Sequence, residues 1–139
     1  MNLLKMFRYM TGVASIDLVI DDEYERLIFV VNKGDLGRAI GRGGRKLEMM
    51  RKIIRKDLGY AVEVVEYDDD LKGFIRNLLS PARVSDIEFV GEGEGKVAYV
   101  KVPEEDLGIA IGKDGRRIRR ARLLVRRWFQ LGNVKIGSS

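Results

Sequence analysis

Two stretches of this sequence are near copies of each other and decide how the chain is organised. They read Asp35-Leu-Gly-Arg-Ala-Ile-Gly-Arg-Gly-Gly-Arg-Lys-Leu47 and Asp106-Leu-Gly-Ile-Ala-Ile-Gly-Lys-Asp-Gly-Arg-Arg-Ile118. They align without a gap at an offset of 71 residues. Internal duplication of this kind takes precedence over length, since 139 residues alone would suit one domain. The chain is therefore predicted to hold two modules, residues 1–68 and 69–139.

Both modules are predicted to follow one order: helix, strand, strand, short helix, long helix, strand. In the first module the periodicity of apolar residues places these elements at 3–10, 15–20, 26–31, 36–40, 45–57 and 62–65. In the second module they fall at 71–79, 83–90, 96–102, a short stretch after Asp106, 116–130 and 134–136. Asp35 and Asp106 are expected to cap the short helices, and the run Asp68–Asp70 the helix that follows it. This order predicts an α+β fold, an α/β sandwich in which helices cover a three-stranded sheet in each module.

The long helices each carry an apolar stripe that is expected to face the core. The stripes consist of Leu47, Met50, Ile54 and Leu58 in the first module and Ile118, Ala121, Val125 and Trp128 in the second. A module of about 70 residues buries only about 60 to 65% of its unfolded surface, which leaves little stability. Because so few residues join the copies, the two modules are expected to pack as one rigid unit.

Positive charge is concentrated in the repeated stretches. Residues 37–56 carry a net +7 and residues 106–127 a net +6 in a chain of net charge +5, so the remainder carries −8. A positive field gathered in two segments is typical of proteins that bind polyanions. The alternative is a pair of solvated helix faces, of the kind that charge-rich proteins carry.

Between the short and the long helix of each module lies a glycine-rich turn of the form Ile-Gly-x-x-Gly. Glycine permits positive φ and a close approach of the backbone, so a phosphate can reach main-chain N–H groups at the positive end of the long helix. The candidate phosphate-binding residues are Ile40, Gly41, Arg42, Gly43, Gly44, Arg45 and Lys46, with Ile111, Gly112, Lys113, Asp114, Gly115, Arg116 and Arg117. The alternative is a duplicated helix-turn-helix corner in which glycine only allows tight packing.

Phosphate contacts position a strand without reading its sequence, so bases must be read elsewhere. The expected base-binding groove is apolar and is floored by the short helix and the third strand. Its residues would be Ala39, Ile40, Val62 and Val64 in the first module and Ala110, Ile111, Val134 and Ile136 in the second. Asp114 departs from the pattern, because a carboxylate repels phosphate; the favoured interpretation is that it caps the long helix.

No enzymatic site emerges from the composition. The sequence contains no Cys and no His, which removes thiolate nucleophiles, the commonest general base and most transition-metal sites. Residues 108–114 imitate a phosphate-binding P-loop, but the spacing is one residue short and Asp114 replaces the required Ser or Thr. We therefore expect no enzyme activity, no cofactor and no metal, and we find no signal peptide or membrane span in the sequence.

These residues resemble the GxxG loops of KH domains, and the order with an additional helix and strand ahead of the core resembles the prokaryotic, type II arrangement. Two such modules in tandem, the second with Asp-x-Gly-x-Ala-Ile-Gly-Lys-x-Gly-Arg, resemble the KH pair of the NusA family of transcription factors, and the whole chain is similar to the short archaeal form. The resemblance implies binding of single-stranded RNA, linked to transcription elongation or termination.

The expected partners follow from this resemblance: single-stranded RNA, with RNA polymerase as a second candidate, for a cytoplasmic monomer. Two other functions stay open. One is a ribosome-associated KH protein, although long basic tails would favour it and this chain has none. The other is a protein-interaction adaptor with vestigial RNA-binding loops, in which the acidic remainder of the chain docks a basic partner.

Overall fold

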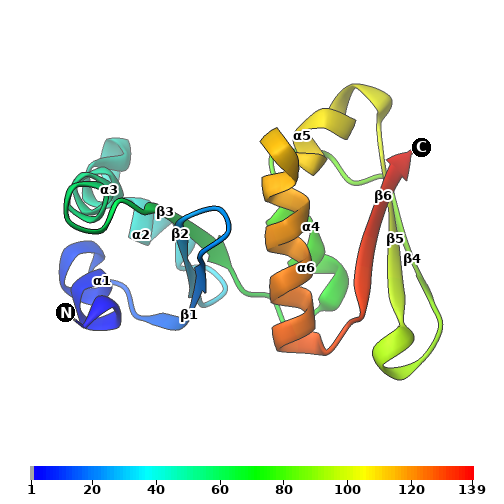
Figure 1. Ribbon diagram of the computed structural model, residues 1–139, viewed down its shortest axis with the longest axis horizontal. Helices are drawn as coiled ribbons and strands as arrows, with labels where there is room; N and C mark the ends of the chain where they lie inside the picture. The colour runs from blue at the N-terminus through cyan, green and yellow to red at the C-terminus, as the bar shows by residue number, and fades with distance from the viewer. Residues whose placement is uncertain (1) are drawn as a thin grey trace. The chain divides into compact units, whose positions relative to one another are not determined.

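The computed structural model describes residues 2–139 and divides them into two compact units, of which the first ends at Tyr67 and the second begins at Asp68. Both units contain the same succession of elements, which Figure 1 colours from blue at the N-terminus to red at the C-terminus. Each is described by itself below.

The first unit is a three-stranded sheet with helices on one side (Figure 1). Its elements are α1 Leu3–Thr11, β1 Ser15–Asp21, β2 Arg26–Val31, α2 Leu36–Ile40, α3 Arg45–Leu58 and β3 Ala61–Glu66. The strands lie in the order β1-β2-β3, with β1 antiparallel and β3 parallel to β2. A parallel pair needs a crossover connection, and α2 and α3 supply it.

The second unit repeats this arrangement. Its elements are α4 Leu71–Leu79, β4 Asp86–Val90, β5 Val97–Val102, α5 Leu107–Ile111, α6 Arg116–Phe129 and β6 Asn133–Ser138. The order β4-β5-β6, with an antiparallel and then a parallel pair, copies that of the first sheet. The predicted α+β fold class, with helices packed on a three-stranded sheet in each module, is confirmed.

The core of the first unit forms between the sheet and the helices. Phe7 of α1 stacks on Phe29 of β2 with ring centroids 4.5 Å apart. From α3, Leu47, Met50 and Ile54 are buried as predicted. Leu58 is 45% exposed, so its assignment to the core was wrong. It is the last residue of α3, and no further turn of helix follows to cover it, because Gly59 ends the helix in the left-handed conformation.

The core of the second unit involves more of its long helix than predicted. Ala121 and Val125 are buried, but so is Leu124, while Ile118 and Trp128 are only half-buried. The reason is α4, which packs along α6 and contributes four fully buried residues, Phe74, Ile75, Leu78 and Leu79. A second packed helix widens the buried face of α6 beyond the stripe that faces the sheet.

The predicted capping of the short helices by Asp35 and Asp106 was wrong. Both residues stand at the N-cap position, but their backbone is helical and neither side chain makes a capping hydrogen bond. A capping side chain reaches the helix N–H groups from an extended backbone. In the first unit Glu66, at the end of β3, replaces this function: its carboxylate accepts from the N–H groups of Gly34 at 3.1 Å and Leu36 at 3.2 Å.

In the second unit Asp106 anchors the chain that precedes β4. Its carboxylate accepts from the N–H of Arg83 at 2.8 Å and from the Arg83 guanidinium at 2.9 and 3.1 Å. This contact explains why β4 begins at Asp86 and not at residue 83 as predicted, since the N–H of Arg83 bonds to a side chain instead of a strand. Hydrogen bonds from the side chain and then the backbone of Arg83 hold the pKa of Asp106 below its ordinary value.

This ion pair predicts a stability difference that depends on pH. Because the pKa of Asp106 is lower in the folded than in the unfolded chain, its charge stabilises the fold above the unfolded pKa of about 3.9, and the contribution is lost as pH falls through the folded pKa. Asp106→Asn should therefore lower the urea midpoint at pH 7, and the difference from the wild type should shrink towards pH 2.

The control is Glu105→Gln, which removes an exposed partner of Arg83 at 3.0 Å and should have little effect, as for most surface ion pairs. A difference between Asp106→Asn and the wild type that stays constant between pH 7 and pH 2 would contradict the assigned role of the Asp106 charge.

Candidate nucleic-acid interface

The two GxxG loops, residues 41–44 and 112–115, have the same backbone conformation. Their first glycines, Gly41 and Gly112, have φ of 80° and 81°, and their last, Gly44 and Gly115, have φ of 71° and 74°. The N–H of each first glycine caps the short helix, donating to the carbonyl of Gly37 at 3.1 Å and of Gly108 at 2.9 Å. The repeated loop sequence thus adopts the same backbone conformation in both units.

The first glycine of each loop also allows a close approach to the long helix. A Cβ at Gly112 would lie 2.8 Å from the backbone nitrogen of Arg117, and one at Gly41 would lie 2.9 Å from Cγ of Lys46. No side chain fits at 2.8 Å from a backbone atom without a shift of the chain. The clash with backbone therefore requires glycine at Gly112, while at Gly41 the Lys46 side chain would have to move and the φ of 80° itself favours glycine.

The third position of the loop distinguishes the two copies. Gly43 has φ 65° and Asp114 has φ 55°, so both lie in the left-handed region, which aspartate tolerates better than most residues. The N-cap of α6 is Gly115, which makes no side-chain cap. The interpretation of Asp114 as the cap of the long helix was therefore wrong; it occupies the backbone position of Gly43.

Three of the predicted cations are available to a ligand. Arg42, Arg45 and Lys113 are exposed, and within residues 2–139 their side chains make no hydrogen bond or ion pair. Lys46 and Arg117, one position further into each long helix than Arg45 and Arg116, bind the protein itself: Lys46 donates to the carbonyl of Thr11 at 3.5 Å, and Arg117 donates to that of Ile109.

Other arginines of the basic segments also have structural roles. Arg51 donates to the carbonyl of Val62 at 3.1 Å, and Arg122 donates to that of Val134 at 3.0 Å, so that each long helix is tied to the third strand of its sheet. Arg120 donates to the carbonyl of Leu78 at 3.1 Å. The charge counted along the sequence therefore exceeds the charge that is free to meet a polyanion.

Half of the predicted base-binding groove is inaccessible. Four of its residues, Ala39, Ala110, Val62 and Val134, are buried in the cores, so their assignment to a groove surface was wrong. The reason is that the alanines of the short helices point towards the sheets, where the inward valines of the third strands meet them. Accessible apolar surface beside the second loop comes from Ile111, 36% exposed, and from Ile109, 42% exposed, which sequence reasoning missed.

Beside the first loop, Ile40 and Val64 are half-buried and pack against the core. Ile136 is likewise half-buried in the second unit. The apolar surface next to the loops is thus more open in the second unit. No periodic signal marks Ile109 as exposed, because α5 has only five residues.

Acidic residues ahead of α4 have structural roles, and those of the described chain do not form a metal site. Residues 2–139 contain no cluster of acidic side chains arranged to hold a metal ion. Asp70 caps α4 as predicted, accepting from the N–H of Gly73 at 3.3 Å, and Asp68 accepts from the N–H of Asp70 at 2.9 Å. Among the described helices none is long and apolar enough to cross a membrane.

Comparison with known proteins agrees with the fold of both units. Residues 5–67 match the family described as KH domain, and residues 71–136 match the family described as NusA-like second KH domain. The crystal structure of APE1850 is similar to the chain with a TM-score of 0.83 and 40% sequence identity, over 96% of this chain and 94% of that one.

Two archaeal relatives matched over most of this chain share one description. A Halobacterium salinarum protein described as a probable transcription termination protein NusA is 36% identical over 135 residues, 97% of this chain and 92% of the relative. A Methanocaldococcus jannaschii protein of the same description is 31% identical over 130 residues, 94% of this chain and 68% of the relative. With two KH domains and relatives matched over nearly its whole length, the chain belongs to the NusA family, in its archaeal form.

Proposed function

We propose that the chain is a non-enzymatic factor that binds single-stranded RNA and acts in transcription elongation or termination, with the two GxxG loops clamping RNA phosphates. The observation that carries the proposal is the repeated loop geometry. Two loops with matching φ values each precede a long helix, and each carries an exposed cation, Arg42 in one and Lys113 in the other. Relatives described as transcription termination proteins support the transcriptional setting.

The chemistry of the loop suits a phosphate. Positive φ at the two glycines turns the backbone sharply between the helices, and no Cβ covers the main chain there. The long helix that follows directs the positive end of its dipole at the same place, and the guanidinium of Arg42 or the ammonium of Lys113 adds a full charge. With their cations engaged by phosphate, the loops would position the strand and leave base selection to the apolar surface beside them.

Single strands suit this arrangement better than duplexes. KH loops hold about four nucleotides each, and RNA is read by protein mainly where its bases are unstacked. RNA polymerase is a candidate second partner, and the chain would act as a monomer. A ribosome-associated role or an adaptor role would require the loops to be idle or to meet a structured RNA, and binding assays separate these cases.

The first expected result is binding to single-stranded RNA that weakens steeply with salt. Two loops would cover about eight nucleotides and neutralise about six phosphates, which gives a slope near −4 for the logarithm of affinity against the logarithm of salt concentration, at about −0.7 per phosphate. Fluorescence anisotropy with a single strand and with a duplex of the same length measures both quantities. A slope near zero, or equal affinity for the duplex, would contradict the proposal.

The second expected result concerns the separate contribution of each loop to RNA binding. Replacing Arg42 and Gly43 by Asp should weaken RNA binding by about tenfold or more through repulsion of phosphate, and Lys113→Asp should do the same in the second unit. Folding should survive, because Asp114 already occupies the backbone position of Gly43. Lys52→Asp with Lys56→Asp, on the exposed part of α3, is a control with a larger change of charge and a smaller expected loss.

Asp114→Gly, which keeps the left-handed backbone without strain, should strengthen binding by removing a charge that opposes phosphate. If this variant binds RNA more weakly at an unchanged melting temperature, Asp114 instead shapes the loop for binding.

A further expected result concerns cooperation between the two modules in folding and in RNA binding. If they pack as one rigid unit, the full chain should unfold in a single thermal transition, and an RNA of about ten nucleotides should bind more tightly than one of about four because the second loop acts at high effective concentration. Calorimetry and a titration with both RNAs make the comparison. Two separate transitions, or no gain for the longer RNA, would mean that the modules act independently.

A further inference from the structure

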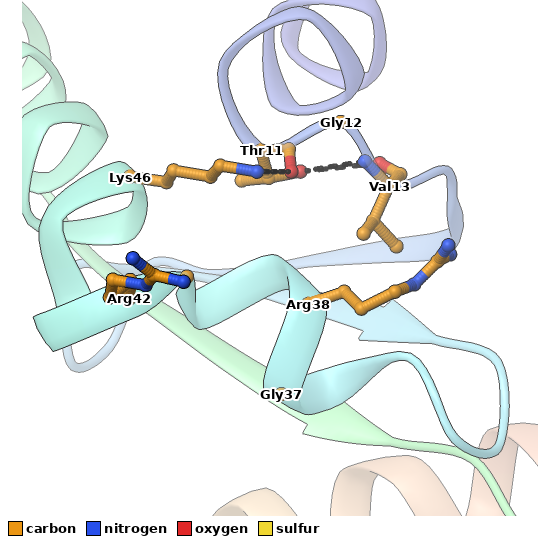
Figure 2. A pocket seen from close by; sticks show the side chains of 8 residues that line it. Thr11, Gly12, Val13, Gly37, Arg38, Arg42 and Lys46 are labelled. Carbon is orange, nitrogen blue, oxygen red and sulfur yellow. Dashed lines mark hydrogen bonds between the residues drawn. The ribbon is translucent and has the colours of Figure 1, made fainter.

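A cleft of about 340 Å³ opens in the first unit, on the side of its GxxG loop that faces α1 (Figure 2). One wall is the end of α1 and the turn after it, with Thr11, Gly12 and Val13. The other wall runs from α2 through the loop to the first turn of α3, with Arg38, Arg42 and Lys46. No residue of β3 lines it, so the cleft is separate from the base-binding groove expected from the sequence.

The charged side chains that line this cleft are all cations. Arg42 makes no hydrogen bond or ion pair among the described residues, and Lys46 reaches across to the carbonyl of Thr11 with a long contact of 3.5 Å (Figure 2). Arg38 is 68% exposed, and its one partner within residues 2–139 is Asp35, which is outside the lining, at 2.9 Å. An exposed pair of this kind contributes little and exchanges readily for another anion.

The cleft stays open because glycines stand along both walls. A Cβ at Gly37 would meet nothing within 4 Å, and one at Gly12 would meet only the Lys46 ammonium at 3.9 Å. On either side of Gly12, Thr11 and Val13 are buried, so this wall is held by the core. The space is therefore preformed, and its volume suits one nucleotide unit, not a long segment.

The second unit lacks this combination. Ile109 takes the position of Arg38 in the repeat. Arg117 takes the position of Lys46, and its guanidinium donates to the carbonyl of Ile109. The chain between α4 and β4 is fixed by Arg83, which is engaged by Asp106 and Glu105. The cationic cleft is thus a property of the first unit and not of the repeated motif.

We infer that this cleft binds one phosphate of the RNA strand in addition to those at the GxxG loop, with Arg38 and Lys46 as its ligands. The inference rests on the proposed RNA binding. Arg42 belongs to both the loop and the cleft, so a strand held at the loop passes the mouth of the cleft with its next phosphate. The long Lys46 contact and the exposed Arg38 pair both exchange for this phosphate. The first module then holds a longer stretch of RNA than the second.

The test compares two double variants of the full chain that lose the same charge. Arg38→Gln with Lys46→Gln removes the ligands of the cleft, and Lys52→Gln with Lys56→Gln removes two exposed cations of α3 outside it. With a single-stranded RNA of about ten nucleotides, the first pair should weaken binding about tenfold and make the salt slope shallower by about 0.7, the value of one phosphate. The second pair should weaken binding by less than about twofold.

The possible results separate the cleft from the proposed function. Equal affinities and slopes for the two double variants, with wild-type binding intact, overturn the cleft and leave the proposed function standing. Failure of the wild type to bind single-stranded RNA overturns both. If the first pair lowers the melting temperature, Arg38→Gln alone replaces it, since that side chain is exposed and should weaken binding about threefold; an unchanged affinity overturns the inference. RNAs with and without a 5′-phosphate show whether the bound group is terminal or internal.

Discussion

The parallel pairing of the second and third strands in each sheet is the constraint on which the rest of the structure depends. Strands β2 and β3, like β5 and β6, run in the same direction, so the chain must cross over between them. The crossover here is two helices, a short one and a long one, which meet at a corner. That corner must turn within a few residues while the long helix returns over the sheet, and Gly41 and Gly112 make this possible because glycine adopts their φ of 80° and 81° without strain. The GxxG loop is thus part of the connection that the parallel strands require.

Arginine has two functions in these units, and their separation explains the high content of basic residues. Arg51 and Arg122 occupy the same place in the two long helices and bind carbonyl groups of the third strands, which fixes the crossover to the sheet. Arg42 and Arg45 lie at the loop and have no partner among the described residues. A helix that is rich in arginine therefore stabilises its own sheet with some side chains and offers the others to solvent, where a polyanion can meet them.

The two copies have diverged around an unchanged backbone. Asp114 takes the left-handed position of Gly43 and adds a negative charge, and Ile109 replaces Arg38 on the short helix. The first unit consequently has a more positive surface next to its loop, with the cationic cleft beside α1, and the second a more apolar one. The two modules therefore combine one loop geometry with surfaces of different chemistry.

The sequence by itself determined the order of the elements, the duplication and the glycine loops, because these depend on local periodicity and on the backbone freedom of glycine. Residues that pair across the fold were decided only by the tertiary structure. Glu66, at the end of β3, accepts from the N–H groups of Gly34 and Leu36 at the start of α2. Arg26 is buried and pairs with Asp21 at 2.9 Å and Glu63 at 3.3 Å.

The same limit holds for the site. The contiguous residues of each loop were predictable, whereas the burial of Ala39 and Val62, the retraction of Lys46 to Thr11 and the cleft beside α1 each depend on a second element brought close by packing. Charge counted along the chain cannot distinguish an arginine that binds a carbonyl from one that is free, since only the folded structure brings the carbonyl within reach.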